Sequence, residues 1–223
     1  LKTSTEDVYI EYLEKLANVV RKYNKTPMIW GDVLVKHPDK ISKLSKDIVF
    51  IDWGYNKAYD FVNHAKMLEE LKVKYLLAPG TSTWSSITGR FIDMKETIEN
   101  STCSSKKYHG LGILLADWGD MGHLQYLPSS YLGFIYGAML SWSSEDAEKY
   151  LAIILNDETL AKVIVELSHY HELEGEYRDY GTRLFASIMW AEHGRRQDDK
   201  VNFFLNRMKS NIISYEAVQK LHD

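Results

Sequence analysis

The chain has 223 residues, of which 45% are hydrophobic and 26% are charged, a composition typical of a globular protein with one sizeable core. Its formal net charge of -4, without any basic block, argues against a nucleic-acid partner, because phosphate binding needs clustered Lys and Arg. No apolar run approaches the roughly 20 residues that a membrane span requires, so we expect no membrane partner either.

The cysteine usage bears on the compartment. Cys103 is the single cysteine and has no partner for an internal disulfide, which favours the reducing cytoplasm over secretion. The first residues, Leu1-Lys2-Thr3-Ser4, do not read as a signal peptide. A secreted or cell-surface parent stays open, because a signal removed from the chain would not be seen. The polar stretch around Cys103 predicts a loop or a helix end.

The first part of the chain alternates helical and strand-like patterns. A helix is predicted over 6–23, capped by Ser4 or Thr5. Its shared apolar face consists of Val8, Tyr12, Leu13, Leu16, Val19, Val20 and Tyr23. Further helices are expected at about 38–45, 60–71, 91–99 and 131–142, and short apolar strands at 27–29, 48–53, 75–78 and 112–117. This alternation predicts a parallel sheet covered by helices.

Two glycines in the helix predicted over 131–142, Gly133 and Gly137, lie four residues apart and form a strip where the helix can sit close to a strand. From residue 145 onward only helical patterns remain, over 145–155, 158–170, 177–192 and 198–221. We therefore expect an α/β domain over 1–143, followed by an all-α extension over 144–223.

A complete (β/α)8 TIM barrel needs about 250 residues and eight strands. Four strands with their helices indicate either a small open α/β domain or part of a barrel whose other strands lie outside the chain.

Tryptophans follow the predicted strands. The triplet Trp30-Gly31-Asp32 recurs as Trp118-Gly119-Asp120, and Asp52-Trp53-Gly54 is a near-copy. The carboxyl ends of parallel strands meet at one edge of a sheet, where ligands bind. Indoles stack on the apolar face of a pyranose, and carboxylates accept hydrogen bonds from its hydroxyls. The candidate substrate-binding residues at this edge are Trp30, Asp32, Trp53, Tyr55, Trp84, Trp118, Asp120 and His123.

Other interpretations of these residues exist. The tryptophans are candidates for the core, and the aspartates for helix caps. Asp120 and His123 are spaced to form a hydrogen-bonded pair or to supply two metal ligands, but two ligands are too few for a convincing site. Arg90 is suited either to a sugar hydroxyl or to a salt bridge within its loop. We expect no metal and no cofactor, since no phosphate loop, Ser/His/Asp elbow or nicotinamide fingerprint is present.

Four segments together resemble the C-terminal half of the glycoside hydrolase family 20 barrel, the β-N-acetylhexosaminidases. They are Pro-Met-Ile-Trp-Gly-Asp at 27–32, Asp-Trp-Gly-Tyr at 52–55, Pro-Gly-Thr-Ser-Thr-Trp at 79–84 and Ala-Asp-Trp-Gly-Asp-Met-Gly-His at 116–123. The resemblance implies a partial TIM barrel, about strands five to eight, with an α-helical extension. It also implies exo-hydrolysis of terminal N-acetyl-β-hexosamine residues, with Trp30, Trp53 and Trp118 lining the pocket and Asp120 binding sugar hydroxyls.

The family mechanism is substrate-assisted, because the 2-acetamido oxygen of the sugar attacks the anomeric carbon. An adjacent Asp-Glu pair supplies the general acid and orients the acetamide. The resemblance places that pair upstream of Leu1, and the one Asp-Glu dipeptide here, Asp157-Glu158, fits a helix start. Trp84 falls where many members have a tyrosine that holds the acetamide.

Three functions follow from these patterns: a hexosaminidase fragment that is inactive by itself, a non-catalytic carbohydrate-binding or scaffold protein, and an unrelated barrel enzyme such as a metal-dependent hydrolase. The expected ligand is a carbohydrate carrying N-acetylhexosamine. Unpaired strand edges of a half barrel would also favour a homodimer.

Overall fold

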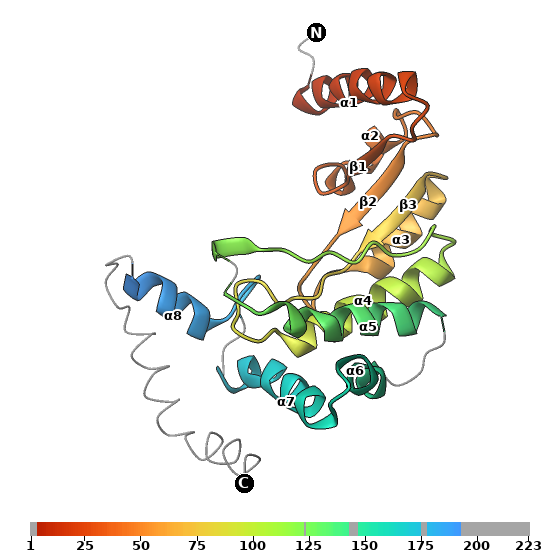
Figure 1. Cartoon of the computed structure of the whole chain (residues 1–223). Helices are drawn as coiled ribbons and strands as arrows, with labels where there is room; N and C mark the ends of the chain where they lie inside the picture. The colour runs from red at the N-terminus through yellow and green to blue at the C-terminus, as the bar shows by residue number, and fades with distance from the viewer. Residues whose placement is uncertain (1–3, 123, 143–146, 175–177, 193–223) are drawn as a thin grey trace. The chain divides into compact units, whose positions relative to one another are not determined.

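The computed structural model describes residues 4–122, 124–142, 147–174 and 178–192 (Figure 1). The fold is mixed α/β, as the alternating pattern predicts. The chain divides into two compact units, the first formed by residues 1–81, 93–116 and 133–147, and the second by 82–92, 117–132 and 148–223. The helix predicted over 198–221 lies outside the described residues.

The elements of the first part of the chain are α1 (Thr5–Lys22), β1 (Met28–Trp30), the 3-10 helix η1 (Leu34–Lys36), α2 (Pro38–Ile41), β2 (Val49–Trp53), α3 (Phe61–Glu70), β3 (Lys74–Ala78) and α4 (Phe91–Lys107). They are followed by η2 (Asp120–Gly122), α5 (Leu127–Trp142), α6 (Ala147–Leu155), α7 (Glu158–Ser168), η3 (Tyr170–Glu174) and α8 (Arg183–Glu192).

The first helix forms as predicted, but it buries a different face. The Ser4 hydroxyl accepts a hydrogen bond from the Asp7 N–H and caps the helix. The buried residues of α1 are Ile10, Leu13 and Ala17. Most of the expected apolar face is exposed instead: Val8, Tyr12, Leu16, Val19 and Tyr23. The prediction of that face was wrong because a 3.6-residue period identifies an apolar stripe without identifying what covers it.

The sheet is parallel and its strands follow chain order, β1-β2-β3. The predicted fourth strand forms only in part. Residues 111–116 run parallel to β3 through isolated bridges at Ile113 and Ala116, with hydrogen bonds such as that from Leu114 N–H to the Leu77 carbonyl (2.9 Å). The carboxyl ends of β1 and β2 lie at the same edge, since Trp30 is aligned with Ile51.

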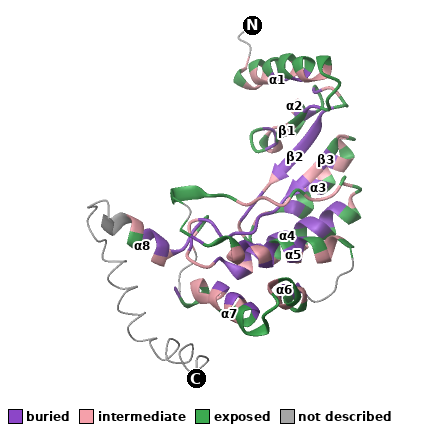
Figure 2. Ribbon diagram, viewed as in Figure 1, coloured by how far each residue is buried: buried purple, intermediate pink, exposed green. Residues whose placement is uncertain are grey.

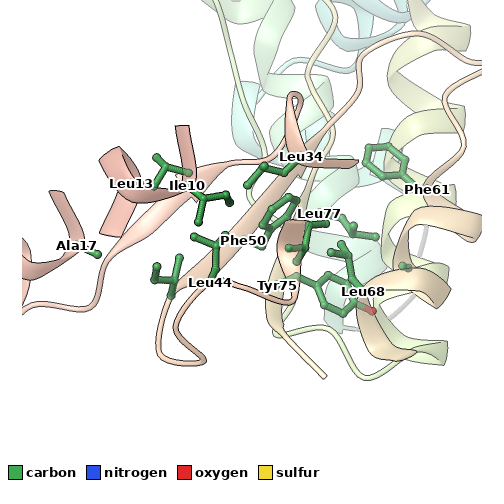
Figure 3. Packing of buried hydrophobic residues seen from close by; sticks show 13 residues of the cluster. Ile10, Leu13, Ala17, Leu34, Leu44, Phe50, Phe61, Leu68, Tyr75 and Leu77 are labelled. Carbon is green, nitrogen blue, oxygen red and sulfur yellow. The ribbon is translucent and has the colours of Figure 1, made fainter. Parts of the chain in front are cut away.

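Helices cover one face of this sheet. Phe50, Tyr75 and Leu77 belong to a single buried cluster with residues of α1, α2 and α3, and Figure 3 shows Leu13 and Leu68 packed around these strands. Ile113, the bridge partner of Leu77, lies on the same face as Leu77. All these helices therefore pack on one side.

The glycine strip of α5 lies close to the sheet, which confirms the prediction for Gly133 and Gly137. A Cβ on Gly133 would lie 2.9 Å from the Thr81 Cα, and one on Gly137 would lie 3.0 Å from a methyl carbon of Leu115. Only hydrogen side chains permit this approach. Because Leu115 and Ile113 are two residues apart on the extended segment, α5 lies on the helix-covered face as well.

The polar segment around Cys103 forms the last turns of α4, so of the two predicted alternatives the helix end is observed and the loop is not. Helix α4 continues to Lys107, and Cys103 is exposed on it. Its small hydroxyl residues bond backwards within the helix, as Ser101 does to the Ile98 carbonyl (3.1 Å) and Thr97 to the Asp93 carbonyl (2.6 Å). These internal bonds allow polar side chains to be buried in a close helix contact.

The described residues 147–174 and 178–192, called the helical extension below, contain α6, α7, η3 and α8 and no strand, as predicted. Asp157 caps α7 by accepting a hydrogen bond from the Leu160 N–H (2.9 Å), which confirms the assignment of Asp157-Glu158 to a helix start. Helix α6 carries a buried Leu151 beside exposed Ile153 and Ile154. Figure 2 shows buried and exposed stretches side by side on α7 as well. Across the parts of the chain that the structure describes, no helix is long and apolar enough to cross a membrane.

Candidate functional site

The first Trp-Gly-Asp triplet lies at the carboxyl end of β1. Trp30 is the last residue of the strand and is 43% exposed. Gly31 crosses the ring of Phe50 so closely that a Cβ would lie 2.1 Å from a ring carbon, and its N–H donates to the Ile51 carbonyl (2.7 Å). The glycine thus turns the chain over a core aromatic, which leaves Trp30 and the exposed Asp32 at the sheet edge.

The second motif ends β2. The rings of Trp53 and Tyr55 stack with centroids 5.1 Å apart and planes inclined by 24°. Gly54 lies against the ring of Tyr59, where a Cβ would approach within 2.0 Å. Trp53 lies two residues beyond Ile51, the partner of Trp30, so Trp30 and Trp53 project from the same face of the sheet. That face is opposite to the one covered by helices.

Asp52, the carboxylate of this motif, points into the helix-covered face. It is fully buried, and it accepts hydrogen bonds from the Tyr59 hydroxyl (2.6 Å) and from Nδ1 of His64 (3.0 Å). The hydrogen bond to Asp52 raises the pKa of His64, against the opposing effect of burial. This group, Asp52, Tyr59 and His64, ties the β2–α3 loop to the strand and was missed from the sequence.

The same loop has a second carboxylate anchor. Asp93, which is fully buried at the start of α4, accepts a hydrogen bond from the Lys57 N–H (3.0 Å). Trp53 and Tyr55 therefore stand at the start of a segment whose backbone is held at two points. Tyr55 itself is only 5% exposed, so it backs the ring of Trp53. An indole held in this way is suited to stacking on a ligand, because little conformational freedom is lost on binding.

In the second unit, Trp84 is buried within the loop that follows β3. Only 1% of its surface is exposed, and the guanidinium of the equally buried Arg90 lies 5.4 Å from the centroid of its ring. This is cation–π geometry. Arg90 therefore pairs with an indole of its own loop, which neither of the interpretations made from the sequence includes.

The second Trp-Gly-Asp triplet is in an exposed turn of the same unit. Trp118 is 43% exposed, and its carbonyl accepts a hydrogen bond from the side-chain amide of Gln125 (3.1 Å). Asp120 is exposed and begins η2, in which Met121 has a φ of 54°. His123 lies outside the described residues.

Residues beside this triplet form a network that the sequence did not indicate. The Thr83 hydroxyl donates to the carboxylate of Asp117 (3.0 Å) and is hydrogen-bonded to the hydroxyl of Ser130 (2.9 Å). Asp117 directly precedes Trp118, so a carboxylate next to the repeated motif was the available signal. The network links the loop after β3 to the turn after the fourth strand segment.

The predicted residues thus fall into two groups. The first unit holds Trp30, Asp32, Trp53 and Tyr55 at one sheet edge, and the second holds Trp84, Trp118 and Asp120 on neighbouring loops. Over the described ranges no three His, Cys, Asp or Glu side chains gather as metal ligands would.

A separate groove of about 560 Å³ lies between α6 and α7 in the helical extension. Its lining includes Lys149, Ile153, Asn156 and Lys162, and none of the predicted site residues. This surface groove is therefore not the candidate site.

The chain was compared with known families and curated proteins. No protein-family model matches it, and no curated protein matches it either. The candidate site is therefore argued from its own residues.

Proposed function

We propose that this chain is the C-terminal half of a (β/α)8 glycosidase barrel of the β-N-acetylhexosaminidase type and that it supplies the aromatic wall of a sugar pocket. One observation carries the proposal: the parallel strands follow one another in chain order, with helices α1, α2, α3 and α5 packed on a single face.

This arrangement supports the barrel among the two architectures left open by the pattern. A doubly wound sheet reverses its strand order so that helices cover both faces. A barrel keeps consecutive order and puts every helix outside, because the other face of the sheet becomes the barrel interior. The order β1-β2-β3 with the segment 111–116 beside β3 fits the second description.

The opposite face of the described sheet also supports the proposal. It is apolar, with Val49 and Ile51 buried at its middle, while Met28 is 49% and Leu114 is 39% exposed at its two margins. Apolar residues on both faces are typical of parallel strands that are buried on both sides. Open margins are expected where further strands of a barrel would continue the sheet.

The exposed face of α1 supplies a further argument. Val8, Tyr12 and Leu16 are 55%, 56% and 44% exposed, and they lie four residues apart along the helix. Helix α1 packs beside β1, the edge strand of the described sheet. A strand added at that edge would cover this stripe, so the stripe and the edge point to the same missing neighbour.

The chemistry follows from the placement of the side chains. In the first unit, Trp30 and Trp53 present indole faces for the apolar side of a pyranose. The second unit, described by itself, carries an exposed indole and an exposed carboxylate, Trp118 and Asp120. In the proposed mechanism the acetamide oxygen of the substrate is the nucleophile, and the general acid comes from the other half of the barrel. The chain's own carboxylates bind and orient.

The proposal is tested by titrating the 223-residue chain with N-acetylglucosamine while the indole N–H signals are followed by NMR. We expect selective shifts and a dissociation constant that rises about tenfold or more in Trp30→Ala, which corresponds to about 1.4 kcal/mol. Trp142→Ala is the matched control, because Trp142 is 91% exposed. Equal responses to N-acetylglucosamine and glucose, or none, would overturn it.

A carbohydrate-binding protein without catalytic activity predicts the same titration. The two are separated by joining the chain to an upstream segment that ends a strand in Asp-Glu. Hydrolysis of an aryl N-acetylglucosaminide by the joined protein supports the enzyme, and binding without hydrolysis supports the binding protein.

A further inference from the structure

The loop after β3, residues 82–91, is fastened to the helical extension within the second unit. The N–H of Ile87 donates to the hydroxyl of Tyr170 (3.2 Å), and the hydroxyl of Thr88 donates to the carbonyl of Leu167 (2.7 Å). These contacts join residues about 80 positions apart along the chain. The extension is therefore part of the loop's support and is not a separate appendage.

The loop needs such support because part of its backbone is strained. Ser82 and Ser85 have φ values of 54° and 50°, in the left-handed region that non-glycine residues rarely adopt. The carbonyl of Ser85 accepts a hydrogen bond from the Thr182 N–H (2.9 Å), and Gly181 packs so closely that a Cβ would lie 3.2 Å from Ser85. The hydroxyls of Tyr170 and Thr182 are themselves 2.8 Å apart.

What this support fixes is the pair of Trp84 and Arg90. The N–H of Arg90 donates a hydrogen bond to the carbonyl of Ser82 (3.1 Å). The strained backbone at Ser82 therefore fixes the position of the Arg90 backbone, from which the guanidinium extends. Trp84 lies between the two strained serines in the sequence. A change at Tyr170 or Thr182 is thus transmitted to the indole through the backbone of the loop.

We propose that Tyr170 and Thr182 are positioning residues that hold the loop 82–91, which the Thr83–Asp117 hydrogen bond joins to the turn of Trp118, so that the helical extension supports the ligand-binding residues of the second unit. The identity of the ligand in this inference rests on the proposed function. The positioning of the loop rests on the hydrogen bonds alone. Burial raises the pKa of Tyr170 to about 12, which keeps its hydroxyl neutral near pH 7.

The experiment compares Tyr170→Phe and Thr182→Val in the 223-residue chain. The matched controls are Tyr126→Phe, whose ring is 82% exposed, and Thr159→Val on the surface of α7. Gly181→Ala is a third variant that perturbs the same loop. It leaves Tyr170 unchanged and adds a methyl group against Ser85. Amide hydrogen exchange of residues 82–91 and acrylamide quenching of Trp84 are measured in the absence of sugar, with the signal of Trp84 identified by subtraction of Trp84→Phe.

We expect exchange in residues 82–91 to increase about fivefold or more in both variants, at least the effect of one lost hydrogen bond, while amides of residues 158–165 in α7 keep their rate. Tyr170→Phe loses the bonds to the Ile87 N–H and the Thr182 hydroxyl, and Thr182→Val loses those to the Tyr170 hydroxyl and the Phe185 N–H. Quenching of Trp84 should rise in parallel, and the controls should match the wild type. A uniform increase across α7 would mean that Tyr170 only stabilises the extension, and it would overturn the inference. Unchanged exchange in the loop would also overturn it.

A second readout separates this inference from the proposed function. If the wild type binds N-acetylglucosamine, Tyr170→Phe should weaken the binding about fivefold, and Tyr126→Phe should not. If the wild type does not bind the sugar but the loop still opens in Tyr170→Phe, the proposed function fails and the positioning role stands. Loop opening with unchanged sugar affinity overturns the role in the site.

Discussion

The hydroxyl of Tyr59 donates a 2.6 Å hydrogen bond to the fully buried carboxylate of Asp52. A buried charge is costly unless hydrogen bonds satisfy it. The hydrogen bonds from Tyr59 and His64 therefore allow an aspartate to lie between the sheet and its helices. The same bond closes the loop that begins with Trp53 and Tyr55. The core and the sheet edge are therefore joined through one side chain.

Removing the Tyr59 hydroxyl should destabilise the protein. A hydrogen bond to a charged group contributes about 1.5–3 kcal/mol, and we expect Tyr59→Phe to lower the free energy of unfolding by that amount in a urea titration. Tyr12→Phe should have no effect, because Tyr12 is 56% exposed on α1. A Tyr59→Phe midpoint equal to that of the wild type would show that the carboxylate does not depend on this hydroxyl.

The stability should also depend on pH through His64. Its pKa is raised above 6.5 in the folded state by the hydrogen bond to Asp52, so the folded state binds its proton more tightly than the unfolded state does. The resulting stabilisation is fully present below pH 6.5 and is lost as the pH rises through the folded-state pKa. His64→Gln should flatten this decline in urea titrations carried from pH 6.5 upward. An identical slope in wild type and variant would contradict the assignment.

The glycines of α5 should be intolerant of alanine to different degrees. Helix propensity alone favours alanine over glycine by about 1 kcal/mol. At Gly133 the added Cβ meets the Thr81 backbone at 2.9 Å, and we expect a net loss of about 1–3 kcal/mol from overpacking. At Gly137 it meets a flexible leucine methyl, so the loss should be smaller. Thermal unfolding of both variants checks the order, and a stabilised Gly133→Ala would contradict the close contact.

The exposed stripe of α1 should make the isolated chain associate. We expect the wild type to elute as a dimer or larger species in size-exclusion chromatography, and Val19→Lys, at a position 51% exposed, to shift it toward monomer without loss of stability. Leu13→Lys is the contrasting change. Leu13 is 7% exposed, so a charge there would disrupt the packing of α1 and lower the stability of the protein. A compact wild-type monomer would argue that nothing is missing at this face.

The chain by itself should not hydrolyse an aryl N-acetylglucosaminide. Its single Asp-Glu dipeptide caps α7, where the Asp157 carboxylate is occupied by the Leu160 N–H. The measurement is release of the aryl group by the purified 223-residue protein. Turnover that disappears in Asp120→Asn would falsify the assignment of the general acid to another segment.

The alternation of helices and strands could be predicted from the sequence because it depends on patterns of neighbouring residues. Short apolar runs and helical spacing identified β1, β2, β3 and most helices to within a few residues. The exposed face of α1 and the full length of α4 were not predictable in this way. The first depends on which neighbour covers the helix, and the second on Ser and Thr hydroxyls that bond to carbonyls one turn earlier, as Ser101 does to Ile98.

The features of the candidate site can likewise be separated into those that depend on neighbouring residues and those that depend on the tertiary structure. The amino-acid sequence by itself determined that tryptophans follow the strands and that glycines adjoin them, since both are properties of neighbouring residues. Only the tertiary structure decided that Gly31 crosses Phe50, that Asp52 faces His64 and that Trp84 is buried against Arg90. A side chain's partner depends on which face of a strand it occupies and on which distant segment returns to it, and neither is encoded within one short motif.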